Sequence, residues 1–194
     1  IEGDFGYSLN DRKELEASDE IALSMKLKTA SYNVKYFFPK MNRWESIIGI
    51  QGMDQTNTNF GEELLIPDAN VKDFGAFATT NYSWASNVLQ AGIRYDNRKI
   101  NTSTHGIEGE EGYFEAIDKQ FNSFNASLGY KTDLSSYIST RINVASGFRA
   151  PNLSELTSNG VHEGSNRYEI GNSELENEQN FQVDLNLEYK SEHF

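Results

Sequence analysis

Apolar and polar residues alternate with a period of two along most of this chain. The clearest case is Phe181–Lys190, in which every apolar residue is followed by a polar one. This is the pattern of a β-strand with one apolar face, and helical spacing is nearly absent. We therefore expect about eight strands, at Phe5–Leu9, Ile21–Phe38, Trp44–Ile50, Phe74–Tyr82, Leu89–Tyr95, Phe124–Tyr130, Ile138–Val144 and Phe181–Tyr189.

The second expected strand changes the parity of its apolar residues. Leu23 and Met25 occupy odd positions, whereas Val34 and Tyr36 occupy even ones. A β-bulge shifts the two faces of a strand by one residue. We therefore expect one bent strand, with a bulge or a bend near Thr29–Ser31.

Short and long connections alternate strictly between these strands. The short ones are Phe38–Asn42, Ser83–Ser86 and Lys131–Ser136, and the long ones are roughly Asp11–Glu20, Gln55–Asn70, Asn97–Gln120 and Phe148–Asn180. A run of about 30 residues without structure is unusual in a compact domain. A transmembrane β-barrel has short turns on one side, long loops on the other, and an apolar outer band around a polar interior. That architecture also explains why a chain with regular apolar faces has a mean hydropathy of −0.63.

Aromatic residues recur beside every short connection. They are Tyr36, Phe37, Phe38, Trp44, Tyr82, Trp84, Tyr130, Tyr137 and Tyr189. The pattern is typical of an interfacial girdle, although aromatic residues also simply favour strands. The opposite face carries polar side chains that fit a wet or plugged lumen, namely Arg94, Asp96, Arg141, Asn143, Gln182, Asp184 and Glu188. Eight strands with such loops indicate part of a larger barrel.

Composition and motifs disfavour several other classes of function. The chain has 17 basic and 29 acidic residues, a net charge of −12, which disfavours nucleic acid as a partner. It has no cysteine, so it forms neither disulfides nor zinc–thiolate sites. No G-x-S-x-G or H-E-x-x-H motif occurs. We expect no enzymatic activity and no cofactor.

Two motifs and the strand after them carry a specific resemblance. "GFRAPNLSEL" spans Gly147–Leu156, and "RYEIGNSELENEQ" spans Arg167–Gln179. Together they resemble the late-barrel signature of TonB-dependent outer-membrane receptors, with Ser173 at a position where that family usually has proline. The residues that match this signature are Phe148, Arg149, Ala150, Pro151, Asn152, Leu153, Glu155, Leu156, Gly171, Asn172 and Leu175.

The resemblance implies a receptor in the bacterial outer membrane that takes up a scarce nutrient, with a ferric siderophore as the default cargo. Residues 1–194 would be a middle-to-late fragment of a roughly 22-stranded barrel, without the plug domain and the final strand. TonB would contact the missing N-terminal segment, and the lipid bilayer would surround the strands. The alternatives are a haem or zinc receptor of the same family and a passive porin-like barrel.

Candidate ligand contacts lie in the two longest loops. They are Arg149, Asn152, His162, Glu163, Arg167, Tyr168 and His105. Arg149 is expected to pair either with loop carboxylates or with an anionic ligand. His162 lies between the two motifs, as a histidine does in haem receptors of the family. The acidic loop Asn101–Lys119 is either a cation site or a solvated loop, and the metal, if any, is unknown.

The strand pattern also predicts how the isolated chain behaves. Its sheet would have two open edges and an apolar face suited to lipid, and both favour association in water. We expect the fragment either to curl until residues such as Leu89, Ile93, Leu128, Ile142 and Leu185 bury each other, or to oligomerise.

Overall fold

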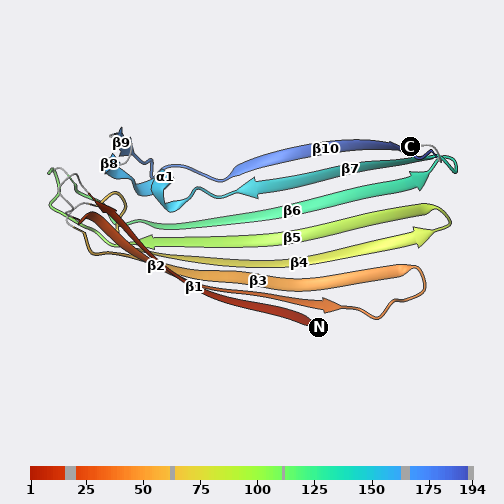
Figure 1. Ribbon diagram of the computed structural model, residues 1–194, viewed down its shortest axis with the longest axis horizontal. Coiled ribbons are helices and arrows are strands. Elements are labelled where there is room, and N and C mark those ends of the chain that lie inside the picture. The colour runs from red at the N-terminus through yellow and green to blue at the C-terminus, as the bar shows by residue number, and fades with distance from the viewer. Residues whose placement is uncertain (16–20, 62–63, 111, 163–166, 192–194) are drawn as a thin grey trace.

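The computed structural model describes residues 1–15, 21–61, 64–110, 112–162 and 167–191. Within these residues eight strands form one antiparallel sheet, and each strand pairs with its neighbours in sequence order (Figure 1). The strands are β1 (Glu2–Leu15), β2 (Ile21–Phe37), β3 (Trp44–Asn59), β4 (Ala69–Trp84), β5 (Asn87–Thr102), β6 (Asp118–Asp133), β7 (Ile138–Arg149) and β10 (Glu178–Tyr189). The predicted all-β meander is therefore confirmed.

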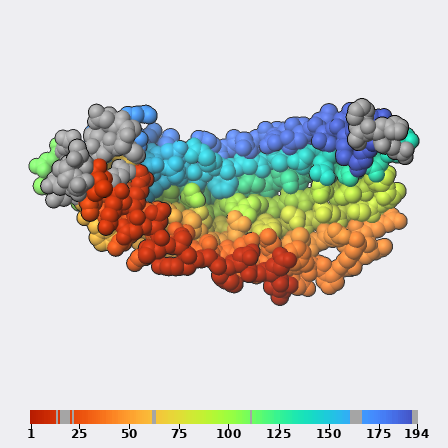
Figure 2. Space-filling model, in the orientation of Figure 1, coloured from red at the N-terminus to blue at the C-terminus, as the bar shows by residue number. Residues whose placement is uncertain are grey.

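The sheet is elongated, with β1 at one long edge and β10 at the other (Figure 2). The short connections lie at one end, the short-turn end, and the long connections lie at the other, the long-loop end (Figure 1). Most strands are longer than their alternating segments predict. For example, β1 extends from Glu2 to Leu15, whereas its alternating segment is Phe5–Leu9. Polar residues continue the hydrogen-bonded ladder after the apolar alternation stops. Within the described ranges, no helix has the length and apolar character needed to cross a membrane.

The pairing register fixes the two faces of the sheet. Ile142 lies opposite Leu185 and Tyr130, and Asn143 lies opposite Asp184 and Gly129. Directly paired residues share a face, so the apolar and polar sets lie on opposite faces, as predicted. We call the face of Ile142 the outer face and the face of Asn143 the inner face. The outer face stays open, with Leu185 76% exposed, so the chain does not curl until these residues bury each other.

The predicted bulge near Thr29–Ser31 is wrong. β2 pairs with both β1 and β3 without interruption through these residues, and the one register shift between β1 and β2 lies at Glu14/Leu15. Leu23 and Met25 therefore lie on the inner face, where both are buried. The parity changes because a different face becomes apolar at the long-loop end, while the strand itself stays regular.

The expectation that Phe148–Asn180 lacks regular structure is also wrong. This segment contains helix α1 (Leu153–Thr157) and a hairpin of β8 (Asn159–His162) and β9 (Arg167–Ile170). We call the described residues 150–162 and 167–177 together the strap. It folds over the inner face at the long-loop end, where its Ala150 and Leu156 form one apolar cluster with strand residues. Those strand residues are Val71, Ile100 and Phe121.

Aromatic side chains form a band on the outer face at the short-turn end. Ring centroids are separated by 4.7 Å between Trp44 and Tyr82, 5.4 Å between Tyr82 and Trp84, and 6.1 Å between Trp84 and Tyr130. The Tyr130 hydroxyl also donates to the Asn87 Oδ1, at 2.6 Å. The band has the position expected of an interfacial girdle.

Candidate functional site

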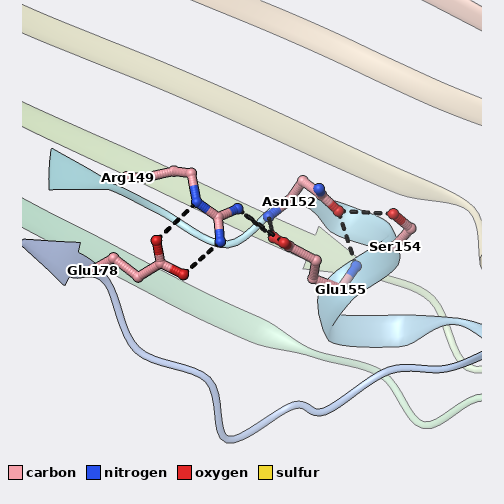
Figure 3. Close-up of polar contacts among 5 residues, drawn as sticks. All are labelled: Arg149, Asn152, Ser154, Glu155 and Glu178. Carbon is pink, nitrogen blue, oxygen red and sulfur yellow. Dashed lines mark hydrogen bonds and ion pairs between the residues drawn. The ribbon is translucent and has the colours of Figure 1, made fainter.

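Arg149, the last residue of β7, connects helix α1 near the start of the strap to the first residue of β10 (Figure 3). Its Nε and Nη2 donate to the two carboxylate oxygens of Glu178 on β10, at 3.1 and 2.6 Å. Its Nη1 donates to both carboxylate oxygens of Glu155 on α1, at 2.9 and 2.8 Å. Charge-assisted, two-pronged contacts of this kind fix orientation as well as distance. We call this group of three residues the Arg149 clamp.

Asn152 begins helix α1 with a capping box (Figure 3). Its Oδ1 accepts the Glu155 backbone N–H at 2.9 Å, and the Glu155 carboxylate accepts the Asn152 backbone N–H at 2.8 Å. This reciprocal pair satisfies two backbone donors that a helix start would otherwise leave open. The hydrogen bonds from Arg149 and from the Asn152 backbone hold the pKa of Glu155 below its usual value. Glu155 is therefore a carboxylate at neutral pH.

The first motif thus shapes the exit from β7 into the strap. The expectation that Arg149 pairs with loop carboxylates is confirmed, and direct contact of Arg149 or Asn152 with a ligand stays a prediction. Glu178 was not among the residues singled out from the sequence. It lies directly opposite Arg149 in the β7–β10 register, so the opposite charges of this cross-strand pair were a usable signal once the register was known.

The second motif docks onto the helix that the first one starts. The Gly171 N–H donates to the Ser158 carbonyl at 2.6 Å, and the Asn172 N–H donates to the Glu155 carbonyl at 2.8 Å. A Cβ at position 171 would lie 2.5 Å from the Thr157 backbone nitrogen, so only glycine permits this approach. The two motifs, separated in sequence, therefore form one folded unit.

The remaining candidate residues are dispersed. The backbones of His162 and Arg167 pair in the β8–β9 hairpin, but the side chain of His162 and all of Glu163 lie outside the described residues. The Tyr168 hydroxyl donates to the Asn159 Oδ1 at 2.9 Å. His105 lies in the β5–β6 loop, where its backbone exchanges two hydrogen bonds with Phe114.

Asn159, which was not among the residues predicted from the sequence, connects the strap to the β5–β6 loop. Its Nδ2 donates to the Tyr113 carbonyl at 3.0 Å. No group of three or more His, Asp or Glu side chains close enough to hold a metal ion occurs in the part of the chain that the structure describes.

A cavity of about 680 Å³ lies along the inner face between β1 and the end of β7. Arg98 donates to both oxygens of Asp73 at 2.7 and 2.6 Å, and Arg94 pairs with Asp96 beside them. Residues from five strands and from Phe148–Ala150 line this one space, so the inner face is concave. The predicted inward orientation of Arg94 and Asp96 is confirmed.

Comparisons with known proteins agree on the fold. No curated protein sequence matches the chain. The fold is similar to that of the copper transporter OprC, with a TM-score of 0.67 and 14% identity over 98% of this chain and 33% of that one. It is also similar to a double mutant of the Serratia marcescens hemophore receptor HasR in complex with its hemophore HasA and heme. That match has a TM-score of 0.65 and 14% identity, over 87% of this chain and 31% of the receptor.

The chain spans about a third of the length of these solved structures. Residues 4–194 match the family described as "TonB dependent receptor-like, beta-barrel". This match includes both motifs, the strap and all the strands of the sheet except the first two residues of β1. The chain therefore belongs to the family of TonB-dependent receptors, as part of their outer-membrane β-barrel.

Proposed function

We propose that this chain is part of a receptor that takes up a scarce nutrient across the bacterial outer membrane by TonB-dependent active transport, with a ferric siderophore as cargo. In this proposal the strands cross the bilayer and the outer face contacts lipid. The long-loop end faces the outside of the cell, and TonB acts through a segment that precedes this sequence. The role is transport rather than catalysis.

The observation that carries the proposal is the inward fold of the strap. In a passive pore the inner wall is lined by water and polar side chains. Here Val71, Ile100 and Phe121 on that wall are buried by the strap, with Ile100 fully inaccessible to solvent. Passage along this part of the wall requires the strap to move. A route that must be opened fits energised uptake better than free diffusion.

The test is an uptake assay with the full-length receptor in cells that lack their own siderophore receptors. Radioactive iron is supplied as a ferric trihydroxamate, to cells with and without TonB. We expect iron to accumulate in cells with TonB and to stay at the background of receptor-free cells without it. Equal accumulation in both strains would identify a passive porin-like barrel and refute the proposal.

A haem receptor is the second candidate, and it has its own supporting observation. β8 places the backbone of His162 in a hairpin between the two motifs, and the similar HasR structure contains heme and a hemophore. A siderophore receptor should not support growth on haem as the sole iron source. Growth on haem that His162→Ala abolishes would favour the haem reading, and TonB-dependent accumulation of radioactive zinc would favour a zinc receptor.

A further inference from the structure

A groove of about 480 Å³ lies between the β5–β6 loop and the strap. Both segments belong to the long-loop end (Figure 1). Residues 113–119 form one wall, and residues 156–159 with 170–174 form the other. This volume lies within the range of small-molecule sites. The larger cavity on the inner face is a poorer candidate, because its ion pairs already satisfy each other.

Cross-links between the two walls preform the groove. The Asn159 amide donates to the Tyr113 carbonyl at 3.0 Å. The Lys119 ammonium lies 4.0 Å from the Glu174 carboxylate. The Arg149 clamp and the Gly171 contact also hold the strap wall in place. A ligand that enters this groove would therefore not have to order it, which lowers the entropic cost of binding.

The groove has both apolar and polar lining residues. Phe114 and Leu156 are both almost fully buried at its base, and Ile117 is partly buried beside them. Ser158 on the strap wall is 5% exposed, and its hydroxyl has no hydrogen-bond partner in the described ranges of the chain. Buried hydroxyls normally have a partner. The Ser158 hydroxyl is therefore an unsatisfied polar group in this wall.

The rim of the groove is acidic. Its lining contains three carboxylates, those of Glu115, Asp118 and Glu174, and one ammonium, that of Lys119. Asp118 also lies 3.6 Å from the Lys99 ammonium. Glu115 makes no ion pair or hydrogen bond through its side chain with any other residue that the structure describes. The groove therefore presents an unneutralised carboxylate beside a lining of mixed polar and apolar residues.

We propose that this groove binds a partly apolar small molecule with a positive charge, and that the receptor therefore prefers a cationic ferric chelate to an anionic one. The inference rests on the proposed function for the identity of the cargo as a chelate. A carboxylate rim on a chain of net charge −12 attracts cations and repels a strongly anionic tricatecholate complex. A hydroxamate complex with a free amine combines an apolar backbone with one positive charge.

Equilibrium binding to the purified full-length receptor tests the inference. Three probes are compared: a ferric trihydroxamate with a free amine, its N-acetylated neutral analogue, and a ferric tricatecholate. We expect the cationic chelate to bind most tightly and the tricatecholate least tightly. Glu115→Gln should weaken binding of the cationic chelate by about fivefold, the effect of one nearby charge in water. It should leave the neutral analogue unchanged, which also shows that the variant is folded.

Glu108→Gln is the matched control, because Glu108 is an exposed carboxylate of the same loop that does not line the groove. Equal affinities for the cationic and neutral chelates, or equal effects of the two substitutions, would overturn the inference and leave the proposed function standing. If none of the three probes binds the native receptor and TonB-dependent iron uptake is also absent, the proposed function itself fails. Added salt should reduce the preference for the cationic chelate.

Discussion

Truncating Leu156 should release the strap from the inner face without unfolding the barrel. Leu156 is 2% exposed and belongs to the apolar cluster with Val71, Ile100 and Phe121. Replacing a buried leucine with alanine costs about 2–5 kcal/mol. Helix α1 has five residues and is too short to be stable without tertiary packing. The loss should therefore appear as local opening of the strap, while the strand ladders stay closed.

Hydrogen exchange on the full-length receptor measures this opening. The Gly171 N–H donates to the carbonyl of Ser158, just after α1, and the Asn172 N–H donates to that of Glu155 in α1, so both are protected while the strap stays folded. If Leu156→Ala costs about 3 kcal/mol, these amides should exchange about 100-fold faster. Leu134→Ala, the same truncation at a residue of a short turn that is 64% exposed, should leave them unchanged. Unaltered protection of Gly171 and Asn172 in Leu156→Ala would refute the role given to the apolar cluster.

Three further predictions concern the strap and the exposed face. Gly171→Ala should accelerate proteolysis of the strap because its Cβ collides with the Thr157 backbone, whereas Gly3→Ala, with only ordinary contacts, should not. The lowered pKa of Glu155 means that its contribution to strap stability is complete above about pH 4.5 and is lost as the pH falls through the lowered value. Glu155→Gln should reduce the pH dependence of the protection factor at Gly171, taken relative to intrinsic exchange, and the remainder comes from Glu178, whose pKa Arg149 also lowers. The 194-residue chain alone should oligomerise in detergent-free buffer, as measured by light scattering. A monodisperse monomer with a freely labelled Leu185→Cys side chain would contradict this.

The sheet was predictable because each strand repeats one simple physical pattern. Alternation in segments such as Phe181–Tyr189 identifies both the strand and its apolar face, and strict alternation of short and long connections orders the strands as a meander. The register then follows from keeping the apolar residues on one side. Strand ends were less predictable, because polar residues such as those at the start of β1 continue the ladder without any hydrophobic signal.

The strap was not predictable from periodicity. Helix α1 is shorter than two turns, and each strand of the β8–β9 hairpin has four residues, too few for a period to emerge. One local signal was present, since Asn152 and Glu155 have the spacing of a capping box. The contacts that hold the strap are long-range, as the pair of Arg149 and Glu178 shows, and depend on the register between β7 and β10.

Other strands also carry apolar residues on the inner face at the long-loop end. Val71 is the third residue of β4, Ile100 the third from the end of β5, and Phe121 the fourth of β6. Each is apolar on the inner face, while residues further along the same strands are apolar on the outer face. An apolar side chain is favoured wherever it leaves water. In the proposed barrel the outer set leaves water by contacting lipid, and the inner set leaves water beneath the strap. In β4, β5 and β6, an apolar residue on the inner face therefore marks the part of the sheet that the strap covers.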